Sequence, residues 1–187
     1  QTNGTLIDEE WAKFLRRNGF LVGISLDGPR DIHNANRVDA FGKGSFARVM
    51  KTTELFNRYG VEYNILSVVN SYMAGHAGYV YNFFKKRGFK FLQFIPCLDP
   101  LEEIPGGHEF SLSPQKYAVF LKELFDLWYQ DLLLGEPVSI RYFDNLLGII
   151  LGYPPEECGM IGQCRCQLIV EADGGVYPCD FYVTDEW

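Results

Sequence analysis

The sequence predicts an α/β protein organised around a parallel sheet. Three short, nearly continuous apolar runs support this prediction: residues 20–26, 61–69 and 89–96. Such runs are typical of strands that are buried on both faces. Helical patterns separate the runs, and each helix–strand unit takes about 30 residues, which is the spacing of βαβ units in a parallel sheet.

The first helix is expected between a cap at Thr5 or Asp8 and a stop near Arg17, where Asn18-Gly19 follows. Its buried side is expected to consist of four apolar residues at helical spacing: Ile7, Trp11, Phe14 and Leu15.

The first strand is followed by Asp27-Gly28-Pro29, which predicts a turn, and then by a polar segment that reaches about Gly44. A second helix is expected from Ser45 to a closing Gly60. A third is expected over about 74–87. These helices complete the alternation that a parallel sheet requires.

A long polar loop is expected at residues 100–114, before two helices at about 114–134 and 140–151. We therefore expect three parts, namely a sheet-bearing domain at residues 1–112, a helical linker at 113–152 and a cysteine-bearing part at 153–187.

Composition excludes several classes of protein. The formal net charge of −7 argues against a general nucleic-acid binder, which needs a basic face. No apolar run reaches the ~18–20 residues of a membrane span, and the first residues do not form a signal peptide. Five cysteines cannot all pair internally, so thiols or metal ligands are expected rather than disulfides, in a cytoplasmic protein.

Polar residues follow the predicted strands at residues 25–28, 69–71 and 96–99. Ligands of parallel sheets bind at this end of the strands. Ser25 and Asp27, with Arg30 and Arg37 close by, could hold the carboxylate and hydroxyls of an amino-acid ligand, because arginine donates two parallel hydrogen bonds to a carboxylate. A simple turn with surface arginines explains the same residues equally well.

Four of the five cysteines lie in residues 158–180, the segment CGMIGQCRCQLIVEADGGVYPCD. A β-hairpin is expected here, with strands at 167–171 and 176–179 around a glycine turn, and it would return Cys179 beside Cys164 and Cys166. The spacing lacks the paired knuckles of structural zinc, so an iron–sulfur site is favoured slightly over zinc. Plain buried cysteines remain an alternative, and the isolated Cys97 is expected to be a packing residue.

Several motifs together resemble the radical S-adenosylmethionine enzymes, and among them the anaerobic sulfatase-maturating enzymes. The motifs are QTNG at residues 1–4, GISLDGP at 23–29, IHNANR at 32–37, FLQF at 91–94, LWY at 127–129, SIRYFD at 139–144, CGM at 158–160 and VYPCDFY at 176–182. The resemblance covers essentially the whole chain.

The resemblance implies part of a (β/α)6 barrel, followed by a helical linker and an auxiliary-cluster domain of the SPASM type. It implies oxidation of a Cys or Ser side chain of a sulfatase to Cα-formylglycine. The cofactors would be S-adenosylmethionine and 4Fe–4S clusters, three in the family, and the partners a sulfatase polypeptide and a reductant such as flavodoxin or ferredoxin.

Residue roles follow from the same resemblance. Ser25 and Arg37 match positions that hold the methionyl end of S-adenosylmethionine, and Leu98 matches a further contact. Asp180 matches the base that takes a proton from the substrate while the 5′-deoxyadenosyl radical removes a β-hydrogen. Three ligands of the first auxiliary cluster are matched by Cys158, Cys164 and Cys179.

The sequence also departs from the family. The Cys-x3-Cys-x2-Cys loop of the radical cluster and the Gly-Gly-Glu-Pro segment are not among the residues. The fourth ligand of the first auxiliary cluster would lie beyond Trp187, so we expect the central portion of a longer enzyme. Two alternatives stay open: a relative that modifies another peptide, and a non-catalytic zinc-binding or scaffold module.

We predict that the 187-residue chain alone does not oxidise a sulfatase peptide, because it lacks the cysteine motif that holds the radical cluster. The measurement is mass spectrometry of a sulfatase peptide after anaerobic incubation with the chain, S-adenosylmethionine and a reductant. Formylglycine formed by this chain would refute the prediction.

Overall fold

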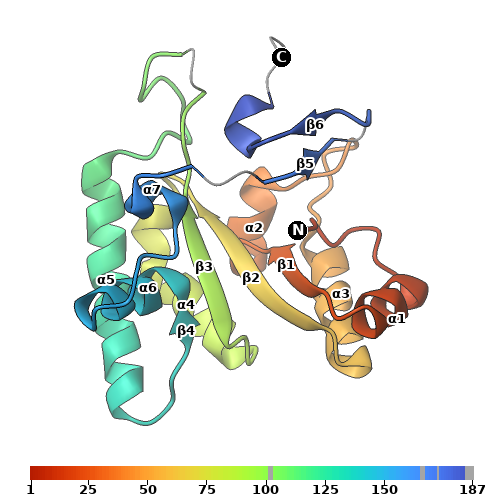
Figure 1. Cartoon of the computed structure of the whole chain (residues 1–187), viewed down its shortest axis with the longest axis horizontal. Coiled ribbons are helices and arrows are strands. Elements are labelled where there is room, and N and C mark those ends of the chain that lie inside the picture. Colours follow the sequence, from red (N-terminus) through yellow and green to blue (C-terminus); the bar gives the residue numbers. More distant parts are fainter. Residues whose placement is uncertain (101–102, 165–166, 172, 184–187) are drawn as a thin grey trace. The chain divides into compact units, whose positions relative to one another are not determined.

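The computed structural model describes residues 1–100, 103–164, 167–171 and 173–183 (Figure 1). The chain divides into two compact units, Gln1–Phe143 and Asp144–Trp187, which are described separately. No helix among the described residues is long and apolar enough to cross a membrane.

The first unit contains a four-stranded parallel sheet in the order β1-β2-β3-β4. The strands are β1 (Leu21–Ser25), β2 (Glu62–Val69), β3 (Phe91–Pro96) and β4 (Ser139–Ile140). The helices are α1 (Glu9–Arg17), α2 (Arg30–Asn36), α3 (Phe46–Tyr59), the 3₁₀ helix η1 (Met73–His76), α4 (Ala77–Lys86), α5 (Pro114–Leu133) and α6 (Arg141–Ile150), which continues into the second unit. The predicted α/β class is confirmed.

Short-range signals set the helix ends. The Asp8 carboxylate accepts a hydrogen bond from the Trp11 N–H at 2.9 Å, which caps α1. Gly60 ends α3 in the left-handed region, at φ 66°, where glycine avoids the steric penalty of a side chain. The Ser113 hydroxyl accepts from Lys116 N–H at 3.3 Å and caps α5.

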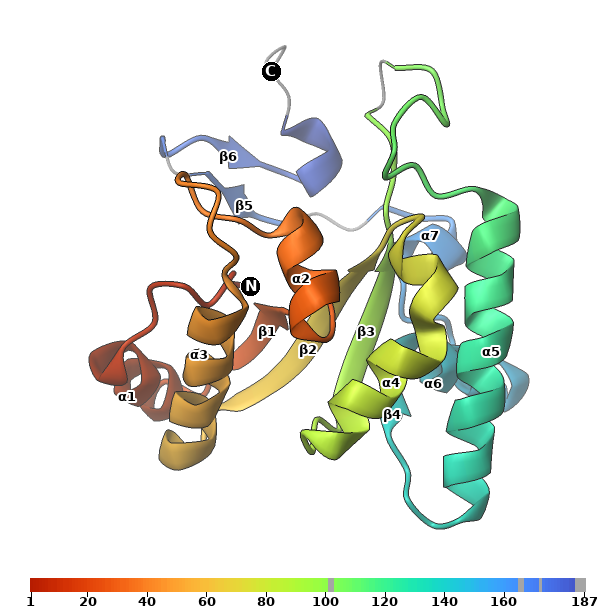
Figure 2. The same ribbon diagram turned by 180° about the vertical axis from the view of Figure 1, so that it is seen from behind.

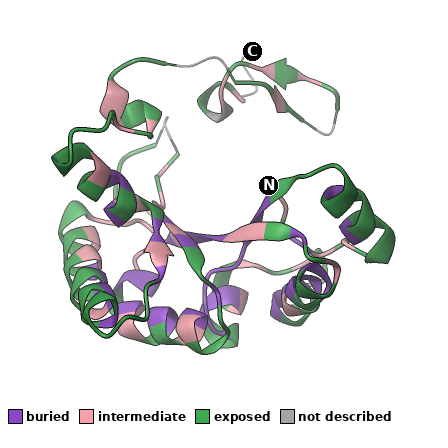
Figure 3. Cartoon of the chain, turned by 60° about the horizontal axis from the view of Figure 1, so that its bottom comes forward, coloured by how far each residue is buried: buried purple, intermediate pink, exposed green. Residues whose placement is uncertain are grey.

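One apolar row crosses the whole sheet. Ile24 pairs with Ile65, Ile65 with Leu92, and Leu92 with Ile140, and each of the four is at most 2% exposed. Figure 2 shows α2, α3 and α4 against one face of the sheet, and Figure 3 shows the buried residues concentrated in the strands and the facing sides of these helices. Successive residues of a strand point to opposite faces, so Ser25 faces away from the side of Ile24.

Several expectations about this unit were wrong in detail. Trp11 and Phe14 are 51% and 41% exposed, and Ala12 and Leu15 are the buried residues of α1. The polar segment after β1 contains α2, which buries only Ile32 and His33 and so has too few apolar residues to be recognised by periodicity. The strand β4 was also missed, because two residues are too few to form a pattern.

The second unit contains the expected β-hairpin. Its strands β5 (Ile169–Val170) and β6 (Val176–Tyr177) are antiparallel and shorter than predicted. Hydrogen bonds from Gln167 N–H to Pro178 O and from Glu171 N–H to Gly175 O, both 3.0 Å, extend the pairing at either end. A short helix α7 (Cys158–Ile161) precedes the hairpin and the 3₁₀ helix η2 (Asp180–Tyr182) follows it.

We predict that Phe84→Ala lowers the free energy of unfolding by about 3–5 kcal/mol, because Phe84 is fully buried and its removal leaves a cavity. Urea unfolding of the chain followed by circular dichroism measures the change. Phe41→Ala is the matched control, because Phe41 is 87% exposed and should lose less than about 0.5 kcal/mol. Equal losses in the two variants would contradict the packing described.

Candidate functional site

The candidate site lies at the carboxyl edge of the sheet in the first unit. The strands β1, β2 and β3 are parallel and end there at Ser25, Val69 and Pro96. The edge is continued beyond β3, where Cys97 N–H donates to Val69 O at 2.8 Å. Because the carboxyl ends of parallel strands are a general place for ligands, the polar side chains here are candidates for binding.

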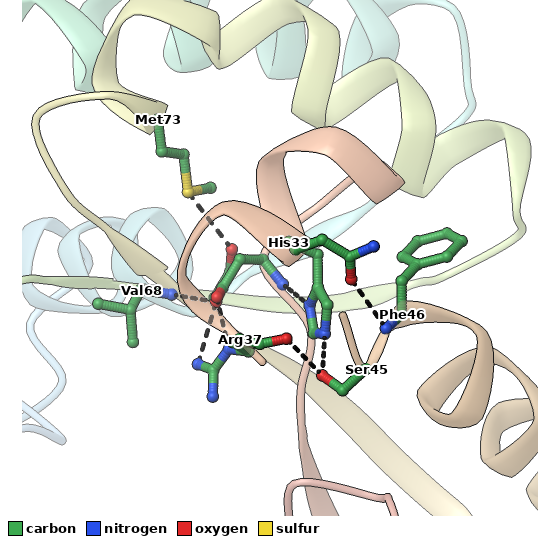
Figure 4. Close-up of polar contacts among 9 residues, drawn as sticks. His33, Arg37, Ser45, Phe46, Val68 and Met73 are labelled. Carbon is green, nitrogen blue, oxygen red and sulfur yellow. Dashed lines mark hydrogen bonds and ion pairs between the residues drawn. The ribbon is translucent and has the colours of Figure 1, made fainter. Parts of the chain in front are cut away.

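The Asp27 carboxylate is the most highly bonded group at this edge. Arg37 donates to it from Nε at 2.5 Å and from Nη2 at 3.1 Å, which makes a two-point ion pair. The Val68 N–H of β2 donates to the same carboxylate at 2.9 Å. Figure 4 shows Arg37 and Val68 converging from different elements. Asp27 therefore connects the loop after β1 to the neighbouring strand and to the end of α2.

A second set of bonds links Asp27 to Arg37 through the backbone. The Asp27 N–H donates to His33 Nδ1 at 3.2 Å, so the ring proton of a neutral histidine is on Nε2. Nε2 lies 2.9 Å from Ser45 Oγ, and that hydroxyl donates to the Arg37 carbonyl at 3.0 Å (Figure 4). The bonds form a closed ring in which each donor meets an acceptor.

Burial keeps His33 neutral. Its side chain is fully buried, and desolvation is the largest effect that lowers its pKa, to about 4. The charge of Asp27 raises the pKa and that of Arg37 lowers it, so these two effects oppose each other and desolvation determines the direction of the shift. Neutral His33 can accept from the Asp27 N–H and donate to Ser45 at the same time.

Arg37 is the most suitable anion-binding side chain at this edge. It follows the last residue of α2, and its own N–H donates to His33 O at 3.0 Å. Its side chain is 27% exposed although it is paired with Asp27. A guanidinium in this position can bind a carboxylate.

The other predicted residues are placed differently. Ser25 is 6% exposed at the end of β1, whereas Leu98 is 61% exposed two residues after β3. Asp27 and Arg30 were named as residues that could hold a ligand, with a simple turn and a surface arginine as the alternative. In the structure Asp27 bonds Arg37, and the Arg30 guanidinium lies 5.4 Å from the Phe46 ring centroid. His33 and Ser45 were not recognised as part of the network, because only the fold brings them together.

Cys97 lies at the same edge and is half-buried. Burial is the largest effect that raises the pKa of its thiol, and the charges of Asp99 and Asp27 raise it further. The thiol therefore stays protonated at neutral pH, which agrees with the role of a packing residue.

The three cysteines of the second unit that the structure describes lie on three separate pieces of backbone. Cys158 begins α7 and is exposed, Cys164 is exposed a short distance after α7, and Cys179 is partly buried after β6. Asp180 begins η2, and Cys166 lies outside the described residues. Among the residues that the structure describes, no three His, Cys, Asp or Glu side chains are grouped to hold a metal ion. The donor type, three thiols in one small unit, still fits an iron–sulfur cluster.

Comparison with known proteins identifies relatives over the full length of the chain. Residues 1–76 match the family model of the radical SAM superfamily. The chain is 60% identical over 187 residues to a Cys-type anaerobic sulfatase-maturating enzyme of Clostridium perfringens and covers 50% of that protein. It is 35% identical to a Ser-type anaerobic sulfatase-maturating enzyme of Bacteroides thetaiotaomicron, of which it covers 48%. The chain thus spans about half the length of the curated relatives it matches.

Solved structures agree with this result. One, described as native anSMEcpe with bound AdoMet, has a TM-score of 0.92 and 60% identity, over 100% of this chain and 51% of that one. Another, described as native anSMEcpe with bound AdoMet and Cp18Cys peptide, has a TM-score of 0.93 and 60% identity, over 100% of this chain and 52% of that one. The resemblance predicted from the motifs is confirmed, and so is the fold.

We predict that His33 makes stability depend on pH between 6.5 and about 4, its ordinary and its folded pKa. In this range the unfolded chain binds more protons than the folded chain. The contribution of His33 to the free energy of unfolding is therefore complete above pH 6.5 and is lost as the pH falls toward 4. The loss amounts to at most about 3 kcal/mol.

Urea unfolding of wild type and His33→Gln across this pH range tests the prediction. His33→Gln should flatten the dependence, because glutamine does not titrate. The same slope in wild type and His33→Gln would contradict it.

Proposed function

We propose that this chain, a relative of the anaerobic sulfatase-maturating enzymes over all its residues, is part of a radical S-adenosylmethionine enzyme of that kind. The observation that carries the proposal is the fold match at a TM-score of 0.92 and 60% identity over the whole chain. The activity belongs to the whole protein: oxidation of a side chain in a sulfatase to Cα-formylglycine.

The substrate side chain is proposed to be cysteine. Identity is 57–60% to three Cys-type enzymes of Clostridium, but 28–35% to three Ser-type enzymes.

A sulfatase polypeptide is the proposed partner, with flavodoxin or ferredoxin as reductant, and the cytoplasm is the proposed location. The proposed division is a barrel domain at residues 1–112, a linker at 113–152 and an auxiliary-cluster domain from 153.

The carboxyl edge is the proposed site for S-adenosylmethionine. Arg37 would bind the α-carboxylate through the N–H groups that Asp27 does not take, and Ser25 would donate its hydroxyl to the same methionyl end. Leu98 is exposed near the end of β3 and would supply an apolar contact. The partial exposure of Arg37 and its fixed orientation support this assignment.

In the second unit, Cys158, Cys164 and Cys179 would hold an auxiliary 4Fe–4S cluster. Such a cluster supplies an electron acceptor when bound. Asp180, which directly follows Cys179 in the chain, would be the base that takes the substrate proton, as its match to the family motif implies. Oxidation of a cysteine side chain to the thioaldehyde removes one hydrogen atom, one proton and one electron, so a base is needed in addition to a hydrogen-abstracting radical. Hydrolysis of the thioaldehyde by water would then give formylglycine and hydrogen sulfide.

The test of the proposal uses the whole protein, prepared anaerobically, with S-adenosylmethionine, a reductant and matched sulfatase peptides that carry Cys or Ser. We predict that the Cys peptide gains formylglycine in mass spectrometry and that the Ser peptide reacts more slowly. Absence of product from both peptides, with 5′-deoxyadenosine still formed, would favour an enzyme with another peptide substrate. Metal analysis of the same preparation that finds zinc and no labile sulfide would favour a non-catalytic zinc-binding or scaffold module.

We predict that Asp180→Asn lowers formylglycine formation by about 100-fold or more, because a general base contributes on the order of 10²–10⁴ in rate. Formation of 5′-deoxyadenosine should persist, since this residue does not bind S-adenosylmethionine in the proposal. Asp173→Asn, in the exposed hairpin turn, is the matched control and should retain full turnover. Equal turnover in Asp180→Asn and wild type would exclude the assigned role.

A further inference from the structure

We propose that Asp27 is a positioning residue for S-adenosylmethionine: it fixes the Arg37 guanidinium so that the remaining N–H groups of that side chain meet the ligand's α-carboxylate. The inference rests on the proposed function. It concerns a residue that would not touch the ligand itself and acts only through Arg37.

The Asp27 carboxylate determines the plane of the guanidinium. It accepts from both Nε and Nη2 of Arg37, at 2.5 and 3.1 Å, and two bonds to one planar group fix its orientation as well as its position. The carboxylate is itself held by the Val68 N–H at 2.9 Å, and its side chain is only 7% exposed. The support for Arg37 is therefore anchored to β2 rather than to a mobile surface group.

The opposite end of Arg37 is fixed as well. Its carbonyl accepts from both the N–H and the hydroxyl of Ser45, each at 3.0 Å, and the His33 ring holds that hydroxyl. An arginine in water samples many rotamers, and binding a ligand would have to order them. Here the two bonds to Asp27 restrain the guanidinium before a ligand binds.

Asp27 leaves a defined set of donors on Arg37. It takes the Nε–H and one hydrogen of Nη2, so the two hydrogens of Nη1 and the second one of Nη2 remain. No hydrogen bond from Nη1 to another described residue is present, and 27% of the side chain is exposed. The Nη1 and Nη2 edge of the fork, which Asp27 does not fully occupy, is the part that can meet a carboxylate in a two-point arrangement.

Equilibrium dialysis with the full-length holoprotein tests the inference. Two ligands are compared, S-adenosylmethionine and 5′-methylthioadenosine, which keeps the adenosine but has no carboxylate. Asp27→Asn should lower the affinity for S-adenosylmethionine about tenfold, because an amide cannot accept both hydrogen bonds that orient the guanidinium. The same variant should change the affinity for 5′-methylthioadenosine less than about twofold. A residue that merely stabilises the fold would weaken both ligands alike.

Asp131→Asn is the matched control. Asp131 is also a nearly buried carboxylate paired with a cation, since Lys85 Nζ lies 2.5 Å away and the side chain is 11% exposed. It accepts a further bond from the Tyr81 hydroxyl at 2.7 Å, in the packing between α4 and α5. This variant should lose comparable stability but bind S-adenosylmethionine as the wild type does.

A double-mutant cycle with Arg37→Lys makes the result independent of the second ligand. If Asp27 acts through Arg37, Asp27→Asn should change the affinity for S-adenosylmethionine less than about twofold in the Arg37→Lys background. A tenfold loss in both backgrounds, or no loss in either, would overturn the inference while the proposed function stands. A wild type that does not bind S-adenosylmethionine would overturn both.

If Asp27→Asn does not fold, as judged by circular dichroism, Asp27→Glu replaces it in the same two-ligand comparison. Glutamate retains the charge but displaces the guanidinium, so the affinity for S-adenosylmethionine should again fall while that for 5′-methylthioadenosine does not. Equal weakening of both ligands by this variant would refute the positioning role.

Discussion

The register of the parallel sheet is the constraint on which the rest of the first unit depends. The apolar row of Ile24, Ile65, Leu92 and Ile140 is nearly free of solvent. A shift of one residue in any strand would turn its apolar side chain to the other face, so burial of the row specifies every pairing at once. The same register brings the carboxyl ends of β1 and β2 together, and Val68 N–H can therefore reach the Asp27 carboxylate.

From this edge the polar network is assembled by short elements. The helix α2 has only seven residues, yet it places His33 inside and Arg37 at its end. Ser45, directly before α3, completes the ring of bonds at the Arg37 carbonyl. A buried polar network of this kind is stable only when every member is satisfied, which the neutral His33 ring makes possible by accepting at one nitrogen and donating at the other.

The sequence predicted those parts of the fold that depend on local patterns. Continuous apolar runs located β1, β2 and β3, and capping residues such as Asp8 located helix ends. The short elements α2 and β4 were missed because their burial comes from tertiary packing. Asp27 and Arg37 were both candidates from their place after the first strand, and the family resemblance gave Arg37 its role. Their pairing was not predicted, since a two-point ion pair between residues ten positions apart follows from geometry and leaves no periodic signal. The roles of the cysteines and of Asp180 rest on motif resemblance and stay predictions.

The pairing of Asp27 with Arg37 also decides how such a site would respond to salt. The chain carries a formal net charge of −7, and the ion pair adds no net charge to the carboxyl edge. Attraction of an anionic group from a distance is therefore weak, and recognition depends on hydrogen bonds made within contact range. Those contacts are shorter than the screening length of about 8 Å at physiological ionic strength, so the affinity of such a site for a ligand's carboxylate would change little with ordinary changes in salt.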